Sequence, residues 1–275
     1  MSKIKIVTDS TAYINKQFAE DNDIAIVPLS VNFEGVISDE GYPGEFQEFF
    51  NRLANSASFP TTSQPSVGTF KTVYEEALKE GKEVIVLTIS SKLSGTYNSA
   101  VTAASLIDGD KVSVIDSEAT AGNLMVLAEM ALEMSREGLS RNEIVEKLEA
   151  QKKRMGINLT VGTLDYLKKG GRLSNTSALI GSLLNIKPII ALKDGKLEPV
   201  AKVRGRKKAL EKIAEDIPAE TDVLNVCHIF ALDEAEEMKR LLEERFPKAT
   251  VKIQELGPVI GAHLGPKALG VTFKY

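Results

Sequence analysis

Apolar residues in the first 155 positions form short continuous runs that alternate with longer segments of helical spacing. The runs are rich in Val and Ile, as buried strands are, and they cover residues 3–9, 24–31, 83–90 and 111–117. Between them, apolar residues recur every three or four positions, which predicts helices over residues 45–56, 70–80, 99–107, 123–138 and 140–155. Strands and helices in this alternation predict a parallel sheet with helices on both faces.

Residues that favour helix ends support these boundaries. Ser66 stands where an N-cap is expected, just before one predicted helix. Ser140 is followed three residues later by Glu143, which is the pattern of a capping box. Gly138 stands where a helix C-terminus favours glycine. We therefore expect these helices to begin and end close to the named residues.

The pattern changes after Met155. Strand-like residues are followed by a Gly-Gly break, an apolar segment of helical spacing, a hairpin pattern around Asp194-Gly195, and then helix, strand, helix and two strands. The first three of these segments cover residues 157–163, 170–171 and 177–186. We place a boundary here, so that residues 1–155 form an N-terminal α/β domain and residues 156–275 a C-terminal α/β domain.

Composition narrows the classes of protein that the chain can represent. Hydrophobic residues make up 43% of the 275 residues and charged residues 26%, with a net charge of −4, which argues against a general nucleic-acid or membrane-surface binder. The single cysteine, Cys227, excludes an internal disulfide and fits a reducing compartment. The start of the chain is too polar for a signal peptide, and an apolar run of 18 residues is absent.

Hydroxyl side chains gather at the ends of predicted strands and at helix entrances. Thr8, Asp9 and Ser10 end the first strand, and Ser94 with Gly95 leads from the third strand into a helix. The stretch "FPTTSQPSVGTF" holds Thr62 and Ser63 upstream of a helix. Such residues often do no more than cap the next helix. In open α/β sheets the same places bind anions, so two hydroxyl-rich entrances also suit a carboxylate.

The histidines and basic groups offer further candidates. His263 stands among glycines and a proline in "GPVIGAHLGPKALG", which predicts a turn where a ligand can approach closely. His228 lies in a predicted strand and is interpreted as structural. Two basic groups, "LKKGGRL" with Arg172 and "KVRGRKK" with Arg204, form either a solvated face or a docking site for an acidic partner.

Several catalytic patterns are missing from the sequence. It has no G-x-x-x-x-G-K-[ST] phosphate loop, no G-x-G-x-x-G dinucleotide fingerprint and no G-x-S-x-G nucleophile elbow. With two histidines 35 positions apart and one cysteine, a His/Cys metal site is not expected either. The residues favour anion binding over a catalytic centre.

Taken together, these segments resemble the DegV family, which includes the fatty-acid-binding subunits of bacterial fatty acid kinase. The resemblance rests on "IVTDSTAYI", "IVPLSVNF", "TTSQPSVGTF", "SSKLSGTYNSA", "LKKGGRLS", "DGKLEPVAKVRGRKKA" and "GPVIGAHLGPKALG", which occur in family order over nearly the whole chain. It implies two α/β domains, the second with a mixed sheet, that hold one fatty acid between them. The carboxylate then lies between the domains, and the C-terminal domain contributes an apolar tunnel.

The resemblance also implies roles for individual residues. By their positions in these segments, Thr62, Ser94 and His263 bind the carboxylate. Four further positions match secondary ligand contacts or the surface that docks the kinase: Ser63, Gly95, Arg172 and Arg204. The hydroxyls would hold the carboxylate without a buried arginine, and a protonated His263 would add a charge-assisted bond. Tunnel walls are expected to include Leu179, Ile180, Leu183 and Leu184.

Under this resemblance the chain is a carrier and not an enzyme. A separate ATP-dependent kinase subunit phosphorylates the bound carboxylate to an acyl phosphate, which an acyltransferase then uses in phospholipid synthesis. The implied protein is bacterial and cytoplasmic, with no cofactor beyond the fatty acid, no metal and no nucleic-acid partner, and with only transient membrane contact.

Two alternatives stay open at the level of sequence. In the first, the chain is an acyl hydrolase in which Ser94 or Thr62 is the nucleophile and His263 the general base. In the second, it binds a different small carboxylate or phosphate and no lipid, because a fold does not fix a ligand.

Overall fold

The computed structural model describes residues 3–107, 109–173 and 185–275. The helix expected over residues 177–186 lies almost entirely outside the described residues. The four leucine and isoleucine residues expected in the tunnel wall, 179, 180, 183 and 184, lie outside them as well.

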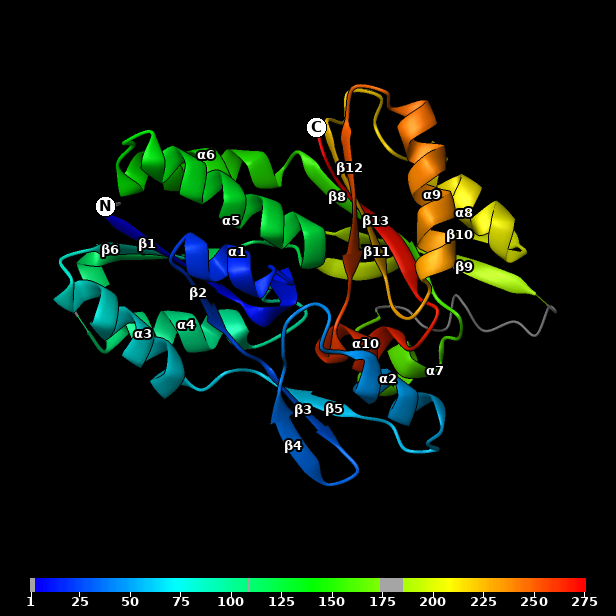
Figure 1. Cartoon of the computed structure of the whole chain (residues 1–275), viewed down its shortest axis with the longest axis horizontal. Helices are drawn as coiled ribbons and strands as arrows, with labels where there is room; N and C mark the ends of the chain where they lie inside the picture. Colours follow the sequence, from blue (N-terminus) through cyan, green and yellow to red (C-terminus); the bar gives the residue numbers. More distant parts are fainter. Residues whose placement is uncertain (1–2, 108, 174–184) are drawn as a thin grey trace.

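Four parallel strands form the sheet of the N-terminal part, as the alternating pattern predicts (Figure 1). They are β1 (Ile4–Asp9), β2 (Ile24–Val27), β6 (Glu83–Thr88) and β7 (Val112–Asp116), in the order β2-β1-β6-β7. Four helices cover its two faces: α3 (Val67–Lys79) and α4 (Thr96–Ser105) on one, α5 (Ala121–Arg136) and α6 (Arg141–Lys152) on the other. The short α1 (Lys16–Asp21) precedes β2.

Side chains alternate between the two faces of these strands, so each face has its own core. Val7, Val84 and Val86 pack with residues of α3 and α4. Their neighbours Ile6 and Ile85 pack instead with residues of α5 and α6. Burial on both faces explains why the strands read as continuous apolar runs.

The helix ends follow the sequence signals. The Ser66 hydroxyl accepts the N–H of Thr69 at 3.0 Å and caps α3, and Ser140 and Glu143 form the expected capping box of α6. Gly138, one residue past the C-cap of α5, has a φ of 87°, which is the left-handed conformation that favours glycine there.

A small antiparallel sheet branches from the first one and corrects one prediction. The run 24–31, expected as a single strand, divides at Pro28 into β2 and β3 (Ser30–Phe33). Proline cannot donate a backbone hydrogen bond, so the chain leaves the parallel sheet there. β3 pairs instead with β4 (Val36–Asp39) and β5 (Thr61–Ser63), in the order β4-β3-β5. The helix α2 (Gln47–Ala54) lies between β4 and β5 in sequence.

The C-terminal part is built on a mixed sheet of six strands, as the resemblance implies. The order is β10-β9-β8-β13-β11-β12; only β11 and β12 are parallel among these pairs. The strands are β8 (Met155–Thr160), β9 (Ile186–Lys193), β10 (Lys196–Arg204), β11 (Val223–His228), β12 (Thr250–Glu255) and β13 (Leu269–Lys274). The helices α8 (Arg206–Glu215) and α9 (Leu232–Arg245) pack on this sheet.

The expected hairpin is present between β9 and β10. Asp194 and Gly195 both have positive φ, at 47° and 76°, as the two central residues of a type I′ turn require. The tip of this hairpin reaches the N-terminal part, where the buried hydroxyl of Ser90 donates to the carbonyl of Gly195 at 2.8 Å. The hairpin therefore ties the two halves of the chain together.

Two short helices, α7 (Asp165–Gly170) and α10 (Pro258–Leu264), lie where the two larger sheets and the small sheet meet (Figure 1). The core at this junction draws side chains from the small sheet, the mixed sheet, α2 and α10, including Val31, Phe50, Leu159, Ile190 and Ile260. No helix among the described residues is both long enough and apolar enough to span a membrane.

Candidate functional site

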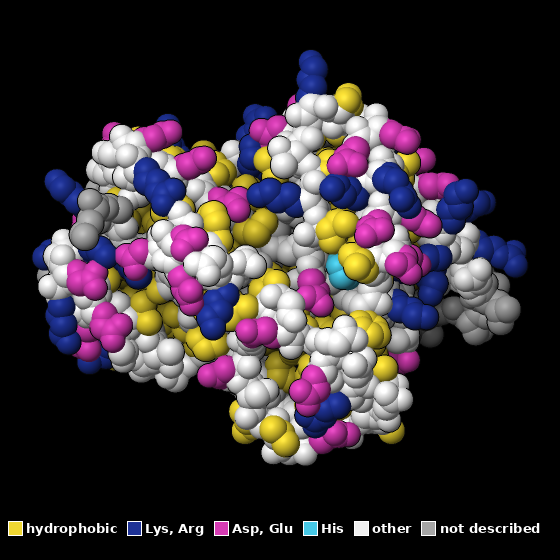
Figure 2. Space-filling view, in the orientation of Figure 1, with side chains coloured by type: hydrophobic (Ala, Val, Ile, Leu, Met, Phe, Trp, Pro, Cys, Tyr) yellow, Lys and Arg dark blue, Asp and Glu magenta, His cyan; other side chains and the backbone are white. Residues whose placement is uncertain are grey.

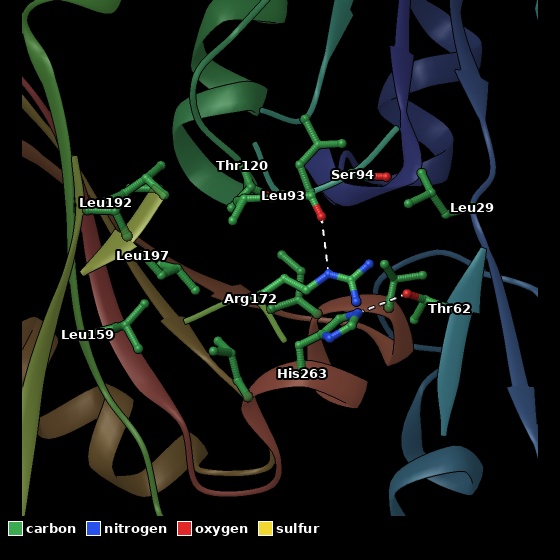
Figure 3. Close-up of a pocket in the computed structure, with 15 residues that line it drawn as sticks. Leu29, Thr62, Leu93, Ser94, Thr120, Leu159, Arg172, Leu192, Leu197 and His263 are labelled. Carbon is green, nitrogen blue, oxygen red and sulfur yellow. Dashed lines mark hydrogen bonds between the residues drawn. The ribbon is translucent and has the colours of Figure 1, made fainter. Parts of the chain in front are cut away.

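A cavity lies at this junction, between β5, the loop that enters α4, the hairpin β9–β10 and α10 (Figure 3). We call it the first cavity; it has about 70 Å³ of space for the centre of a water molecule. Its walls consist of aliphatic side chains with a small group of polar ones: Leu29, Thr62, Ile89, Leu93, Ser94, Thr120, Ile157, Leu159, Arg172, Leu192, Leu197, Val259, Ile260, His263 and Leu264. Thr62, Ser94, Arg172 and His263 are hereafter the polar cluster.

The contact between Thr62 and His263 joins two residues 201 positions apart. The Thr62 hydroxyl lies 2.8 Å from Nε2 of His263 (Figure 3). Thr62 is the middle residue of β5 and pairs with Val31 of β3, so the small sheet fixes its position. The sequence named both residues, and the structure brings them into direct contact.

His263 lies on a helix and not on the turn that its glycine-rich setting predicted. It occupies the last turn of α10, where all the other residues of the helix are buried. Pro258 stands at the start of the helix, where proline is tolerated. Gly261 allows α10 to approach Phe50 closely, since a Cβ there would lie 2.6 Å from the ring. The glycines therefore serve close packing of a helix rather than flexibility.

The imidazole of His263 is neutral near pH 7. Burial, and after it the positive charge of Arg172, lowers the pKa of His263 from 6.5 to about 4. Its Nδ1 atom is buried and has no hydrogen-bond partner among the described residues. The structure thus differs from the expectation of a protonated His263, because the positive charge in the cluster belongs to Arg172.

The segment Gly170-Gly171-Arg172 is shaped to hold a guanidinium beside this imidazole. Gly170 lets the ring approach, since a Cβ there would lie 2.3 Å from Nδ1 of His263. Gly171 ends α7 with a φ of 67°, in the left-handed region. Arg172 then turns into the first cavity, where its Nε donates to the carbonyl of Leu93 at 3.3 Å and Nη1 to that of Gly170 at 2.5 Å. Of the two roles expected for Arg172, a secondary ligand contact or kinase docking, its place in this wall favours the ligand contact.

Ser94 enters the first cavity from the loop before α4. The N-cap of α4 is Gly95, so Ser94 is not the cap residue; its hydroxyl lies 2.9 Å from that of Thr96. Gly95 has a separate function, because a Cβ there would lie 1.9 Å from Oε1 of Gln64. Gln64 crosses this bare backbone and donates to the Ser99 hydroxyl at 2.9 Å.

Gln64 was missed by the sequence analysis, although it stands in the "TTSQP" stretch. Its amide holds the loop of Thr62 against the helix that follows Ser94, and so fixes the spacing of the two hydroxyls. The sequence did carry a signal for this contact: Gln64 lies two residues after Thr62, and Gly95 directly follows Ser94. Leu29 and Thr120, which also line the first cavity, carried no signal that separates them from core residues.

The other expected site residues lie outside the first cavity. Ser63 is exposed, because side chains alternate along β5 and Thr62 takes the inner face. Arg204 is exposed at the end of β10. Its neighbour Arg206 forms an ion pair with Glu234 at 2.6 Å. Figure 2 shows basic and acidic side chains interspersed over one face of the molecule, as on an ordinary solvated surface.

Asp9, the last residue of β1, has structural partners. Asp9 is buried and accepts the backbone N–H groups of Thr11 and Ile89, at 3.0 and 2.6 Å. Burial raises the pKa of Asp9 to about 6. His228, the last residue of β11, is buried as expected, and desolvation lowers its pKa. Within residues 3–107, 109–173 and 185–275, no group of acidic, Cys and His side chains could hold a metal ion.

A second cavity adjoins the first one and is almost wholly apolar. The two share Thr120, Ile157, Leu159, Ile260 and Leu264 as walls. The remaining walls of the second cavity are Ala121, Cys227, Leu256, Ala268, Leu269, Gly270 and Thr272. One cationic and three hydrogen-bonding side chains therefore line a cavity next to an apolar one, which suits a molecule with an anionic head and a hydrocarbon body.

The chain matches known proteins over nearly its full length. Residues 3–275 match the family model described as "Uncharacterised protein, DegV family". A DegV domain-containing protein of Halalkalibacterium halodurans is 38% identical over 283 residues, with 99% of each chain covered.

Two solved structures are similar to the present one. A DegV family protein from Thermus thermophilus, whose structure is described as showing fatty acid binding, has 34% identity and a TM-score of 0.90, covering 100% of this chain and 99% of its own. DegV of Bacillus subtilis, described as a fatty acid binding protein, has 34% identity and a TM-score of 0.87, with 100% of both chains covered. The chain studied here belongs to the DegV family.

Proposed function

We propose that this protein binds a long-chain fatty acid, with the carboxylate at the polar cluster and the acyl chain along the second cavity. The observation that carries the proposal is that an apolar cavity adjoins the cavity of the polar cluster and shares four aliphatic wall residues with it. The fatty acid binding described for the relatives from Thermus thermophilus and Bacillus subtilis supports it.

The energetics of such a complex are favourable at both ends. Each buried methylene contributes about 0.8 kcal/mol, so a long acyl chain gains on the order of 10 kcal/mol before the costs of association. An unpaired carboxylate would lose several kcal/mol on burial. Arg172 offsets this loss with a positive charge, while Thr62, Ser94 and His263 offer neutral hydrogen-bonding groups.

We further propose that the bound carboxylate is presented to a separate ATP-dependent kinase subunit, which forms an acyl phosphate for an acyltransferase. In this role the protein is a carrier in the bacterial cytoplasm and not the catalyst. A carrier needs an exposed surface for its partner. Ser63 is exposed next to Thr62, and Arg204 is exposed at the end of β10 opposite to the cavity-lining Leu197. Both positions suit docking better than ligand contact.

The geometry does not favour the alternative of a hydrolase. The Ser94 hydroxyl hydrogen-bonds to Thr96 rather than to a histidine. Thr62 does contact His263, as a nucleophile and its base would, but such a pair also needs a group that orients the imidazole. Among the described residues, none accepts a hydrogen bond from Nδ1 of His263, so the orienting member of a triad is missing. The alternative of a small polar anion does not explain the second cavity, whose walls are apolar.

Direct binding measurements test the proposal. Delipidated protein is titrated with oleate, and the retained lipid of untreated protein is identified by mass spectrometry. We expect binding at or below micromolar concentration. Thr62→Val should weaken it about fivefold, since a neutral hydrogen bond contributes about 1 kcal/mol.

The matched control is Thr61→Val, on the exposed face of the same strand, which should bind oleate as the wild type does. Delipidated wild-type protein that takes up no fatty acid would refute the proposal. Equal losses in the two threonine variants would instead remove Thr62 from the site.

A further inference from the structure

The helix α10, which carries His263, is tied at both ends to the same small sheet. At its start, the N–H of Val259 donates to Oε1 of Glu40 at 2.7 Å. At its end, His263 contacts the Thr62 hydroxyl. Glu40 directly follows β4, and Thr62 lies on β5; both strands pair with β3. One three-stranded sheet therefore holds both ends of a two-turn helix.

The carboxyl group of Glu40 is buried in a network of hydrogen bonds. Its side chain is 6% exposed and accepts from the Ser10 hydroxyl at 2.7 Å and the Tyr13 hydroxyl at 3.1 Å. The Tyr13 oxygen in turn accepts the N–H of Ile260 at 3.4 Å, so two N–H groups of the first turn of α10 reach this network. The Ser10 oxygen accepts the N–H of Leu29 at 3.1 Å.

The helix start lacks a cap of its own. The first backbone N–H groups of any helix need acceptors from outside it, and the N-cap of α10, Gly257, has no side chain to offer. A Cβ at Gly257 would lie 2.7 Å from Oε1 of Glu40 and 2.8 Å from the ring of Phe46. The glycine therefore leaves room for an acceptor that comes from 219 residues earlier in the chain.

Stability alone does not account for a carboxyl group in this place. Burial raises the pKa of Glu40 to about 7, because the charged form is poorly solvated there. Replacing a buried charged group by apolar residues is often neutral or stabilising. A buried acid that supplies a directional acceptor to one helix end suits a role in placing that helix.

We propose that Glu40 is a positioning residue that sets the place of the His263 imidazole against Thr62 by holding the first turn of α10. Val259 and His263 are four residues apart, about 6 Å along the helix axis, so a shift of the first turn moves the imidazole with it. The inference rests on the proposed function in one respect: the proposed function supplies the ligand that His263 binds.

The acceptor at Oε1 is present in both protonation states of Glu40. In the neutral acid, Oε1 still accepts from Val259 and Tyr13, while the protonated Oε2 can donate to Ser10. A glutamine has the same shape and the same pattern, with its amide nitrogen in place of the protonated oxygen. Glu40→Gln should therefore preserve the position of His263, and Glu40→Ala should lose it.

Nuclear magnetic resonance of ligand-free protein labelled with ¹⁵N in histidine tests this directly. The chain has two histidines, so two imidazole spin systems are expected, and His228 on β11 serves as an internal reference. In Glu40→Ala, we expect the His263 signals to shift and its pKa to rise from about 4 toward 6.5, because a displaced ring gains exposure. The His228 signals should stay, and Glu40→Gln should give the wild-type spectrum.

The matched control is Glu45→Ala. Glu45 lies in the segment between β4 and α2 and accepts the backbone N–H of Tyr42 at 2.9 Å, away from α10. This variant should leave both histidines unchanged. A folded Glu40→Ala protein with wild-type His263 signals and pKa would overturn the proposal, as would a Glu40→Gln protein that resembles Glu40→Ala.

A second variant covers the case in which Glu40→Ala does not fold. Tyr13→Phe keeps the carboxyl group but removes the phenol that contacts Glu40 and Ile260. It should move the His263 signals in the same direction by a smaller amount, and unchanged signals would contradict the proposal. These spectra need no lipid, so a failure of wild-type protein to bind oleate would refute the proposed function and leave this inference standing.

Discussion

The polar cluster and the second cavity adjoin the same helix, but they are built in opposite ways. The polar cluster takes one residue each from β5, the loop before α4, the segment after α7, and α10. The second cavity takes half of its walls from β8, β11 and β13, which are neighbours in one sheet. The polar cluster depends on contacts that fix separate elements relative to one another. The second cavity depends on the alternation of side chains along paired strands.

The two regions also differ in charge. The polar cluster contains a guanidinium and a titratable imidazole, and the junction behind it holds the buried acids Asp9 and Glu40. The titratable group of the second cavity is the thiol of Cys227, and burial raises its pKa to about 12. Changes of pH between 4 and 8 should therefore act on the polar side alone.

The largest predicted effect uses this difference in pH response. The pKa of Glu40 rises from 4.5 to about 7 on folding, so its contribution to stability is complete below pH 4.5 and is lost as the pH rises through 7. Glutamine does not titrate. The free energy of unfolding of Glu40→Gln relative to wild type should therefore increase by up to about 3 kcal/mol between pH 4.5 and 7.5.

Urea unfolding of the two proteins at both pH values measures this change. The lowered pKa of His263 contributes with the opposite sign but is common to both proteins, so it cancels in the difference. A difference between the proteins that does not vary with pH would show that Glu40 titrates at its ordinary pKa.

The second prediction removes the charge from the polar cluster. Arg172→Met should weaken fatty acid binding by about 2 kcal/mol, roughly thirtyfold, because a hydrogen bond to a charged group is lost. The loss should be similar for acyl chains of all lengths, since the second cavity is untouched. Isothermal titration with fatty acids of several lengths measures it, and Lys169→Met, at an exposed cation three residues earlier, is the control.

The third prediction acts on the second cavity and leaves the polar cluster intact. Ala268 is buried in its wall, and Ala268→Leu adds three carbons that occupy space needed by the end of a long chain. Displacing about three methylenes should cost about 2 kcal/mol for the longest ligand that the wild type accepts, and much less for a chain three carbons shorter. A loss that does not depend on chain length would place the acyl chain elsewhere.

The smallest predicted effect concerns the spacing of the hydroxyls. Gly95→Ala should weaken oleate binding by about 1 kcal/mol, because the new methyl group meets the Gln64 side chain. Gln64→Ala, which removes the obstructing amide, should restore much of the affinity when it is added to Gly95→Ala. A double variant weaker than either single one would show that the two residues act independently.

Much of the fold follows from local signals in the sequence. The parallel strands, the Asp194-Gly195 hairpin and the capping of α3 and α6 are set by hydrophobic spacing and by turn and cap residues close in sequence. The break of the run 24–31 was missed because Pro28 was included in an otherwise strand-like pattern. The helix α10 was missed because its glycines look like a turn until the rings that pack on them are known.

The residues of the candidate site also differ in whether the sequence alone could identify them. Thr62, Ser94 and His263 stand out by residue type, and the structure places them in one cavity. Gln64 and Glu40 act through partners 35 and 219 positions away, which a single sequence does not reveal. The walls of the second cavity are ordinary core residues by type, so only their arrangement distinguishes them from the rest of the interior.

The strand β5 reads Thr61, Thr62, Ser63, so every residue of it carries a hydroxyl. Only the middle one reaches the first cavity, because successive side chains point to opposite faces of a sheet. If β5 slipped by one residue against β3, either neighbour would take the inner place and a hydroxyl would still stand opposite His263. The triplet thus makes this wall of the site tolerant of an error in strand register.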